Sequence, residues 1–197
     1  CIEKDKAKNI QIQIITNGTL ITKEWLEKLS NFKVVILTVS IDGTGNTYEY
    51  IRYPTVWTET EEKLLLINEF TKKHSHMRME ITFCLQVYNM FEIHKMIMLR
   101  RKLKCLLNCI VLDNPEYLDV SNAPEQAKID AIDLVEKINL EDNYNEERFR
   151  NDVLNKFKQS RTKNEFYCKY TVNEYSTIKD PYRNQKFEEQ EIYKYYV

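Results

Sequence analysis

The chain alternates between short apolar runs and longer stretches in which apolar residues recur every three to four positions. Residues 9–15 and 32–39 are rich in β-branched side chains, and the later runs at 79–87 and 106–112 have the same character. Near-continuous apolar runs of this length are typical of strands buried on both faces of a parallel sheet. The pattern therefore predicts four strands at these positions.

Helical periodicity follows each of the predicted strands. After the first strand, Ile21, Leu26 and Leu29 fall on one helical face. Further along, Thr58 and Glu61 have the spacing of a capping box at the start of a helix. Helices are predicted at residues 22–30, 61–73, 91–104 and 124–138, and with weaker periodicity at 146–159.

Strand and helix signals thus alternate four times over residues 9–138, which is typical of βα units with right-handed crossovers. We expect an α/β fold with a parallel sheet. The composition shifts near residue 139, and from there to residue 197 the chain is polar and rich in Tyr and Asn. This shift divides the chain into residues 1–138 and a C-terminal extension, 139–197. The pattern leaves open whether the extension is an appended lobe, a hairpin or a loosely ordered tail.

Composition narrows the possible partners. Lys and Arg total 29 and Asp and Glu total 30, so the formal net charge of −1 argues against a nucleic-acid partner. No apolar run reaches about 18 residues, so no membrane-spanning helix is expected. The five cysteines are odd in number and irregularly spaced, which favours free thiols and a cytoplasmic setting, or a host cytoplasm for a viral protein. The basic run at residues 100–104 is interpreted as a solvated helix end.

The candidate chemistry lies in two turns that follow the first two predicted strands. Thr16 and Asn17 precede Gly18, and Ser40 and Asp42 precede the next glycine, Gly43. The carboxyl ends of neighbouring parallel strands meet at one edge of the sheet, where ligands bind in this class of fold. The hydroxyl and amide groups can hydrogen-bond an amino acid or a ribose. The same residue types are also ordinary turn formers that need no ligand.

A resemblance joins these turns to a known family. The stretches ITNGTLITKEWLEKL and VVILTVSIDGTGNTYEYIRYPTVW, followed by LLLINEF, resemble the middle of a radical S-adenosylmethionine (SAM) enzyme. More narrowly, they resemble phage-like members that carry a short C-terminal "twitch" extension. The TNG at 16–18, the SIDG at 40–43 and the IR at 51–52 match in order and spacing. The resemblance is best over residues 10–70.

The resemblance implies a partial (β/α)6 TIM-like barrel with a C-terminal extension. In this family an external donor supplies an electron to a [4Fe-4S] cluster. The reduced cluster cleaves SAM to a 5′-deoxyadenosyl radical, which abstracts hydrogen from a substrate. The substrate stays open as a peptide, a nucleotide or a small metabolite.

The family's SAM-contacting positions can be carried over to individual residues. The position of Thr16 lies close to SAM, that of Ser40 contacts its ribose or carboxylate region, and that of Arg52 is placed to bind its carboxylate bidentately. Asn17 and Asp42 shape the two turns. The resemblance therefore implies a SAM site made of these five residues.

The sequence departs from the family in its cysteines. The family's three cluster ligands form a C-x3-C-x2-C loop, whereas Cys105 and Cys109 are followed by Leu112 at the third position. We expect these two thiols to be buried and structural, so no metal ligand is predicted in this chain. Because the chain begins at Cys1, we expect it to be a fragment whose cluster loop lies upstream, with residues 10–15 forming an edge strand.

Two other interpretations remain open from the sequence. The chain can be a non-catalytic α/β half-barrel binding module that has no cluster and recognises a nucleoside-like ligand or a protein. It can also be an unrelated α/β protein whose turns match the family by chance.

Overall fold

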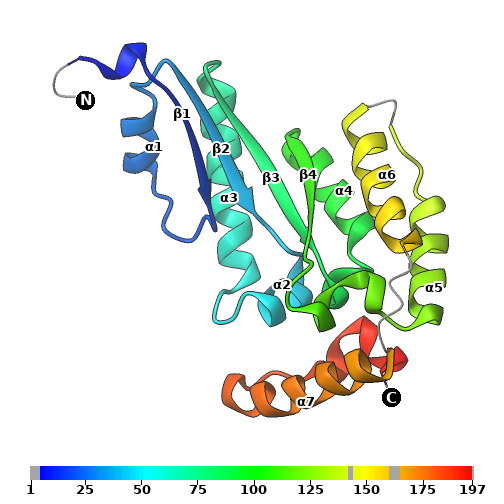
Figure 1. The fold of residues 1–197 in the computed structure, drawn as a ribbon. Helices are drawn as coiled ribbons and strands as arrows, with labels where there is room; N and C mark the ends of the chain where they lie inside the picture. Colours follow the sequence, from blue (N-terminus) through cyan, green and yellow to red (C-terminus); the bar gives the residue numbers. More distant parts are fainter. Residues whose placement is uncertain (1–4, 142–143, 160–164, 197) are drawn as a thin grey trace.

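The computed structural model describes residues 5–141, 144–159 and 165–196 (Figure 1). Four strands pair in parallel in the order β1-β2-β3-β4, which confirms the predicted α/β class and its parallel sheet. The strands are β1 (Gln11–Thr16), β2 (Val34–Ser40), β3 (Met77–Leu85) and β4 (Leu106–Val111). The helices are α1 (Lys23–Leu29), α2 (Gly45–Ile51), α3 (Trp57–Lys73), α4 (Ile93–Leu103), α5 (Glu125–Glu136), α6 (Tyr144–Lys158) and α7 (Glu165–Arg183).

The two faces of the sheet differ in burial, most clearly along β2. Val35, Leu37 and Val39 of β2 are fully buried on the face that contributes to the core. The residues between them along β2 are less buried. At the outer side of the sheet, β1 pairs with β2 alone among the described strands, which confirms that residues 10–15 belong to an edge strand. The sheet thus has one apolar packing face and one mixed face.

The segment between β2 and β3 differs from the prediction. No helix is predicted between the strand at 32–39 and residue 61, but α2 lies there and α3 begins at Trp57. The predicted capping box of Thr58 and Glu61 is wrong, because Val56 is the N-cap residue and its side chain makes no capping hydrogen bond. The backbone N–H of Trp57 instead donates to Glu49 Oε1 at 2.8 Å. A carboxylate from the preceding helix therefore accepts a hydrogen bond from a free backbone N–H at the start of α3. The spacing of residues within α3 cannot predict this contact.

Helix α6 protects the outer edge of β4. The side-chain amide of Asn145 accepts a hydrogen bond from the backbone N–H of Leu107 at 3.0 Å and donates one to the Leu107 carbonyl at 3.0 Å. The amide thus takes the place of a neighbouring strand on backbone groups that an edge strand leaves unpaired. One turn further along α6, the ring of Phe149 meets Phe83 of β3 edge to face, with centroids 6.0 Å apart. The helix is part of the core around the sheet.

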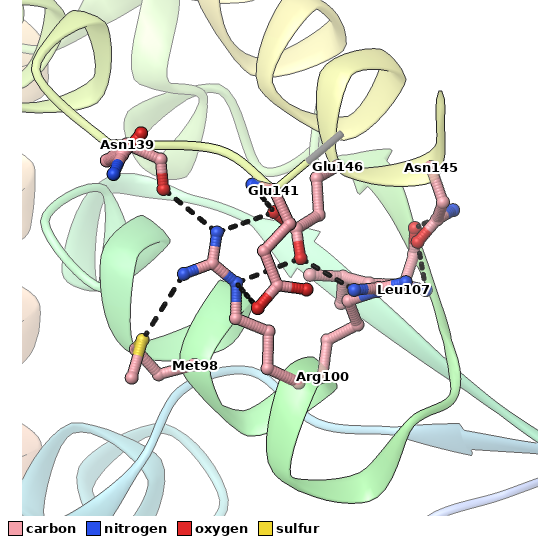
Figure 2. Close-up of polar contacts among 8 residues, drawn as sticks. Met98, Arg100, Leu107, Asn139, Glu141, Asn145 and Glu146 are labelled. Carbon is pink, nitrogen blue, oxygen red and sulfur yellow. Dashed lines mark hydrogen bonds and ion pairs between the residues drawn. The ribbon is translucent and has the colours of Figure 1, made fainter. Parts of the chain in front are cut away.

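A buried carboxylate joins α6 to α4 (Figure 2). The side chain of Glu146 is fully buried and accepts hydrogen bonds from Arg100 Nη1 at 2.6 Å and Arg101 Nη2 at 2.7 Å. Its Oε2 also accepts from the backbone N–H of Glu141 at 3.1 Å. The interpretation of this basic run as a solvated helix end is therefore wrong for Arg100, which is buried. The reason is the buried partner carboxylate, which lies 46 residues further along the chain.

The described part of residues 160–197 is mainly helix α7, followed by two short 3-10 helices. Helix α7 lies across the edge at which the strands end (Figure 1). The hydroxyl of Tyr50 in α2 donates to Asp180 Oδ1 at 3.0 Å and lies 3.1 Å from Ser176 Oγ. The Gln185 side chain donates to the carbonyl of Glu49 at 2.8 Å. These contacts attach the C-terminal segment to the carboxyl-end edge of the sheet. The division of the chain into two parts at residue 138 stays a prediction.

The Glu146→Gln variant is expected to lose about 3 kcal/mol of unfolding free energy at pH 7, because two arginines lose their buried counter-charge. The matched control is Glu147→Gln, an exposed glutamate in the same helical turn, which should change stability by less than about 0.5 kcal/mol. Urea denaturation measures both variants.

The difference between Glu146→Gln and the wild type should depend on pH. In the wild type, Glu146 accepts hydrogen bonds from Arg101 and lies beside the positive charges of Arg100 and Arg101. These interactions hold the pKa of Glu146 below its usual range. A carboxyl group with a lowered pKa stabilises the fold above its unfolded-state pKa, and this contribution is lost as the pH falls through the folded-state pKa. The two proteins should therefore approach the same stability in acid. A difference that persists unchanged in acid would contradict an ionic role for Glu146.

Candidate functional site at the carboxyl ends of the strands

The turn after β1 is closed by its own side chains. Thr16 Oγ1 accepts a hydrogen bond from the backbone N–H of Gly18 at 3.0 Å, and Asn17 Oδ1 accepts one from the N–H of Thr19 at 3.2 Å. Gly18 has a φ of +82°, and a Cβ atom there would lie 3.1 Å from Val39 Cγ1. The turn therefore packs tightly against β2 and leaves the side chain of Asn17 exposed at the edge.

The turn after β2 is built around Asp42, which is only 4% exposed. Its Oδ1 accepts a hydrogen bond from the backbone N–H of Cys84 at 3.1 Å, and its Oδ2 accepts one from Arg52 Nε at 2.6 Å. One carboxylate thus connects the ends of β2 and β3 with the end of α2. Because both oxygens already have donors, Asp42 acts as a positioning residue that holds Arg52.

Arg52 directly follows α2 and keeps part of its side chain in solvent. Its side chain is 30% exposed, whereas that of Asp42 is 5% exposed. Since Nε is bound to Asp42, the plane of the guanidinium group is fixed while the terminal nitrogens Nη1 and Nη2 remain for another partner. The described residues supply no hydrogen bond to these two nitrogens. A fixed planar pair of donors is well suited to a carboxylate or phosphate ligand.

A row of polar side chains crosses the mixed face of the sheet near its carboxyl end. Ser40 of β2 is in register with Thr82 of β3, which is in register with Asn108 of β4. All three are half-buried, and they alternate with the core residues of their strands. Two hydroxyls and an amide in line can hydrogen-bond the hydroxyls of a ribose or the backbone groups of an amino acid.

The thiol of Cys84 lies at the same end of β3. Burial raises the pKa of this thiol, and the charge of Asp42 raises it further, while Arg52 acts in the opposite direction. Cys84 is therefore a protonated, half-buried side chain beside the Asp42–Arg52 pair. It adds a weak donor to this edge and no nucleophile.

Asn89 is a site residue that the sequence analysis missed. It is completely buried, and its amide nitrogen donates to the carbonyls of Cys84 at 2.8 Å and Asp42 at 3.1 Å. Its Oδ1 accepts from the backbone N–H of Gln86 at 2.8 Å. Asn89 thus connects the backbone at the ends of β2 and β3. The signal in the sequence was the Gln86-x-x-Asn89 spacing, which forms a capping box directly after β3.

Glu92 is the second missed residue. It is 3% exposed, and its Oε2 accepts hydrogen bonds from the backbone N–H of Thr44 at 3.0 Å and from the Thr44 hydroxyl at 2.9 Å. Lys95 neutralises it with an ion pair of 2.6 Å. Because Gly43 has a φ of +143° and Thr47 lies 3.2 Å from where a Cβ would stand, the turn before α2 requires glycine. Glu92 locks this turn to the start of α4.

The five predicted residues are only partly brought together. Asp42 and Arg52 are in direct contact, and Ser40 lies two residues before Asp42 on the adjoining strand end. The pairing of Thr16 with Val39 places Asn17 level with Ser40 along the strand direction. Within the described part of the chain, no hydrogen bond connects the turn of Thr16 and Asn17 to Asp42 or Arg52.

An iron–sulfur cluster does not fit the residues that the structure describes. Within them, no three His, Cys, Asp or Glu side chains gather to hold a metal ion. Cys105 is buried directly before β4 and Cys109 is half-buried within β4, so neither lies in a loop that could wrap a cluster. Cys1 lies outside the described residues.

Comparisons with known proteins add a likeness of fold. No protein-family model matches the chain, and no curated protein matches its sequence. A solved structure described as "Native anSMEcpe with bound AdoMet and Cp18Cys peptide" is similar in fold at a TM-score of 0.45 and 16% sequence identity. The match covers 64% of this chain and 36% of that chain, so this chain spans about a third of its length. In the part of the chain that is described, no helix has both the length and the apolar character needed to cross a bilayer.

The Asn89→Ala variant is expected to lose about 3 kcal/mol of unfolding free energy, because three buried hydrogen-bonding groups lose their partner. The matched control is Asn151→Ala on the exposed face of α6, where the change should stay within about 0.5 kcal/mol. Thermal and urea unfolding measure both. Equal stability of the two variants would show that Asn89 does not brace the strand ends.

Proposed function

We propose that this chain is the C-terminal part of a radical SAM enzyme and that its carboxyl-end edge binds SAM. In this proposal Arg52 binds the SAM carboxylate, Ser40 contacts the ribose or carboxylate region, and Thr16 lies close to the bound molecule. Asn17 and Asp42 shape the two turns. The proposal is supported by the motif resemblance of residues 10–70 and by the position of these residues at the end of a parallel sheet.

The observation that carries the proposal is the orientation of Arg52. A buried carboxylate fixes its Nε at 2.6 Å, and the side chain still reaches solvent at the edge of the sheet. Its terminal nitrogens have no hydrogen-bond partner among the described residues, so an incoming ligand can bind them. An amino-acid carboxylate is the part of SAM that such a donor pair recognises.

The chain's own residues then bind and orient the molecule. The chemistry that SAM supplies in this family is hydrogen abstraction by the 5′-deoxyadenosyl radical. Arg52 holds the carboxylate end, and the hydroxyl of Ser40, in line with Thr82, bonds the polar groups of the sugar. Since the described residues do not fit the iron–sulfur cluster, no electron-transfer step is assigned to them. The electron donor and the substrate, whether peptide, nucleotide or small metabolite, remain part of the proposal.

The alternative function is a binding module that takes a nucleoside-like ligand at the same edge and has no cluster. The observation that favours it is that, within the described residues, no three His, Cys, Asp or Glu side chains gather to hold a metal ion. The coding sequence ahead of Cys1 distinguishes the two functions. An in-frame C-x3-C-x2-C motif supports the enzyme, and a start codon directly before Cys1 supports the binding module.

Calorimetric titration of the chain with SAM tests the site. The Arg52→Gln variant is expected to lower SAM affinity about tenfold, because a charge-assisted bidentate contact is lost. The Ser40→Ala variant, which removes one neutral hydrogen bond, should lower it about threefold. The control is Arg148→Gln, which removes an exposed arginine on α6 and should leave the affinity unchanged.

Circular dichroism must show that the variants stay folded. If SAM fails to bind, or binds equally well to the wild type and to Arg52→Gln, the proposed SAM site is wrong. The third interpretation, an unrelated α/β protein whose turns match by chance, is supported if the substitutions at Ser40 and Arg52 change the affinity for no ligand at all, nucleosides included.

A further inference from the structure

A pocket lies at the same edge of the sheet, beyond β3 and β4. Its volume is about 280 Å³. The segments after the two strands contribute Gln86 and Leu112, the end of α2 contributes Ile51, and α7 closes the pocket from outside. Figure 1 shows α7 running across this edge below the strand ends. None of the five predicted SAM residues lines this pocket, although Ile51 directly precedes Arg52.

The charge in this pocket is positive. Helix α7 directs Lys179 and Arg183 into it, one helical turn apart. Neither of them forms an ion pair with any described residue. The carboxylate nearest in sequence, Asp180, is used elsewhere, since its oxygens accept from the Tyr50 hydroxyl at 3.0 Å and from the backbone N–H of Phe187 at 2.6 Å. Both cations therefore lack an ion-pair partner among the described residues, and the charge of Asp180 offsets that of Lys179 only in part.

Aromatic rings surround the lysine. Its ammonium group lies 4.3 Å from the ring centre of Tyr50, 5.1 Å from that of Tyr88 and 5.2 Å from that of Tyr175. Burial and the neighbouring charge of Arg183 lower the pKa of Lys179 to about 8. Rings compensate a buried cation only in part, and placing a second cation beside it is unfavourable unless an anion joins them.

The remaining walls are apolar and aromatic. Leu112, Pro115 and Leu118 follow β4, and the ring of Tyr117 lies 5.7 Å from that of Tyr175. A pocket of this size holds a small molecule about as large as an amino acid side chain with a short polar end. A bare inorganic anion would leave these walls without contact.

We infer that this pocket binds a small organic carboxylate whose charged end lies between Lys179 and Arg183 and whose apolar body packs against the aromatic wall. The carboxylate replaces the missing counter-ion for both cations. The inference goes beyond the proposed SAM site and does not depend on it, because the two sites share no residue.

NMR titration of the chain, without SAM, provides the test. The probes are phenylacetate, its uncharged isostere phenylacetamide and inorganic phosphate. Phenylacetate is expected to shift the amide signals of α7 and the segment after β4, and to bind at least tenfold more tightly than either of the other two. Because SAM is absent, failure here leaves the proposed function untouched, and failure of the SAM titration leaves this pocket untouched.

Two substitutions assign the binding to the cations. Lys179→Met keeps the length and apolar stem of the side chain and should weaken phenylacetate binding at least tenfold. Arg183→Gln provides a second variant and should also weaken it. The control, Lys186→Met, removes an exposed lysine outside this pocket and should have no effect. Equal binding of phenylacetate and phenylacetamide, or of phenylacetate and phosphate, would overturn the inference, as would full binding by Lys179→Met.

Discussion

The buried carboxylate of Asp42 is the interaction on which the carboxyl-end edge depends. A charge that is 4% exposed is tolerated in a protein only when donors surround it, and here the donors come from β3 and from the residue after α2. Asn89 adds hydrogen bonds to the backbone of the same two strand ends. The result is that two strand ends, a helix end and one arginine form a single hydrogen-bonded unit.

A similar arrangement holds the C-terminal part of the chain. Glu146 gives α4 and α6 a shared buried charge, and Asn145 supplies β4 with the hydrogen bonds that a further strand would provide. At the other end of the sheet, Ser176 and Asp180 of α7 bond to Tyr50. Residues from both sides of position 138 therefore share one set of contacts around the sheet.

Two groups of cationic side chains lie at the carboxyl-end edge of the sheet. At the end of β2 the cation is an arginine whose orientation a buried carboxylate fixes. Beyond β3 and β4 the cations belong to α7, and tyrosine rings take the place of a carboxylate. The first can orient a ligand directionally, and the second provides a confined positive pocket with apolar walls. A parallel sheet offers both at one edge because all of its strands end there.

The sequence by itself determined the elements whose signal is local. Continuous apolar runs predicted four parallel strands, and glycine after β1 and after β2 marked the turns that carry Asp42 and the hydroxyl residues. Local patterns also identified most of the helices, but not α2 or α7. Polar side chains of these two helices form hydrogen bonds with segments far away in the sequence. Only the tertiary structure decided that Arg100 is buried, that Asp42 holds Arg52, and that Lys179 lies among three tyrosines. The physical reason is that burial and charge pairing arise between residues far apart in the chain, and periodicity reports only which face of an element is apolar.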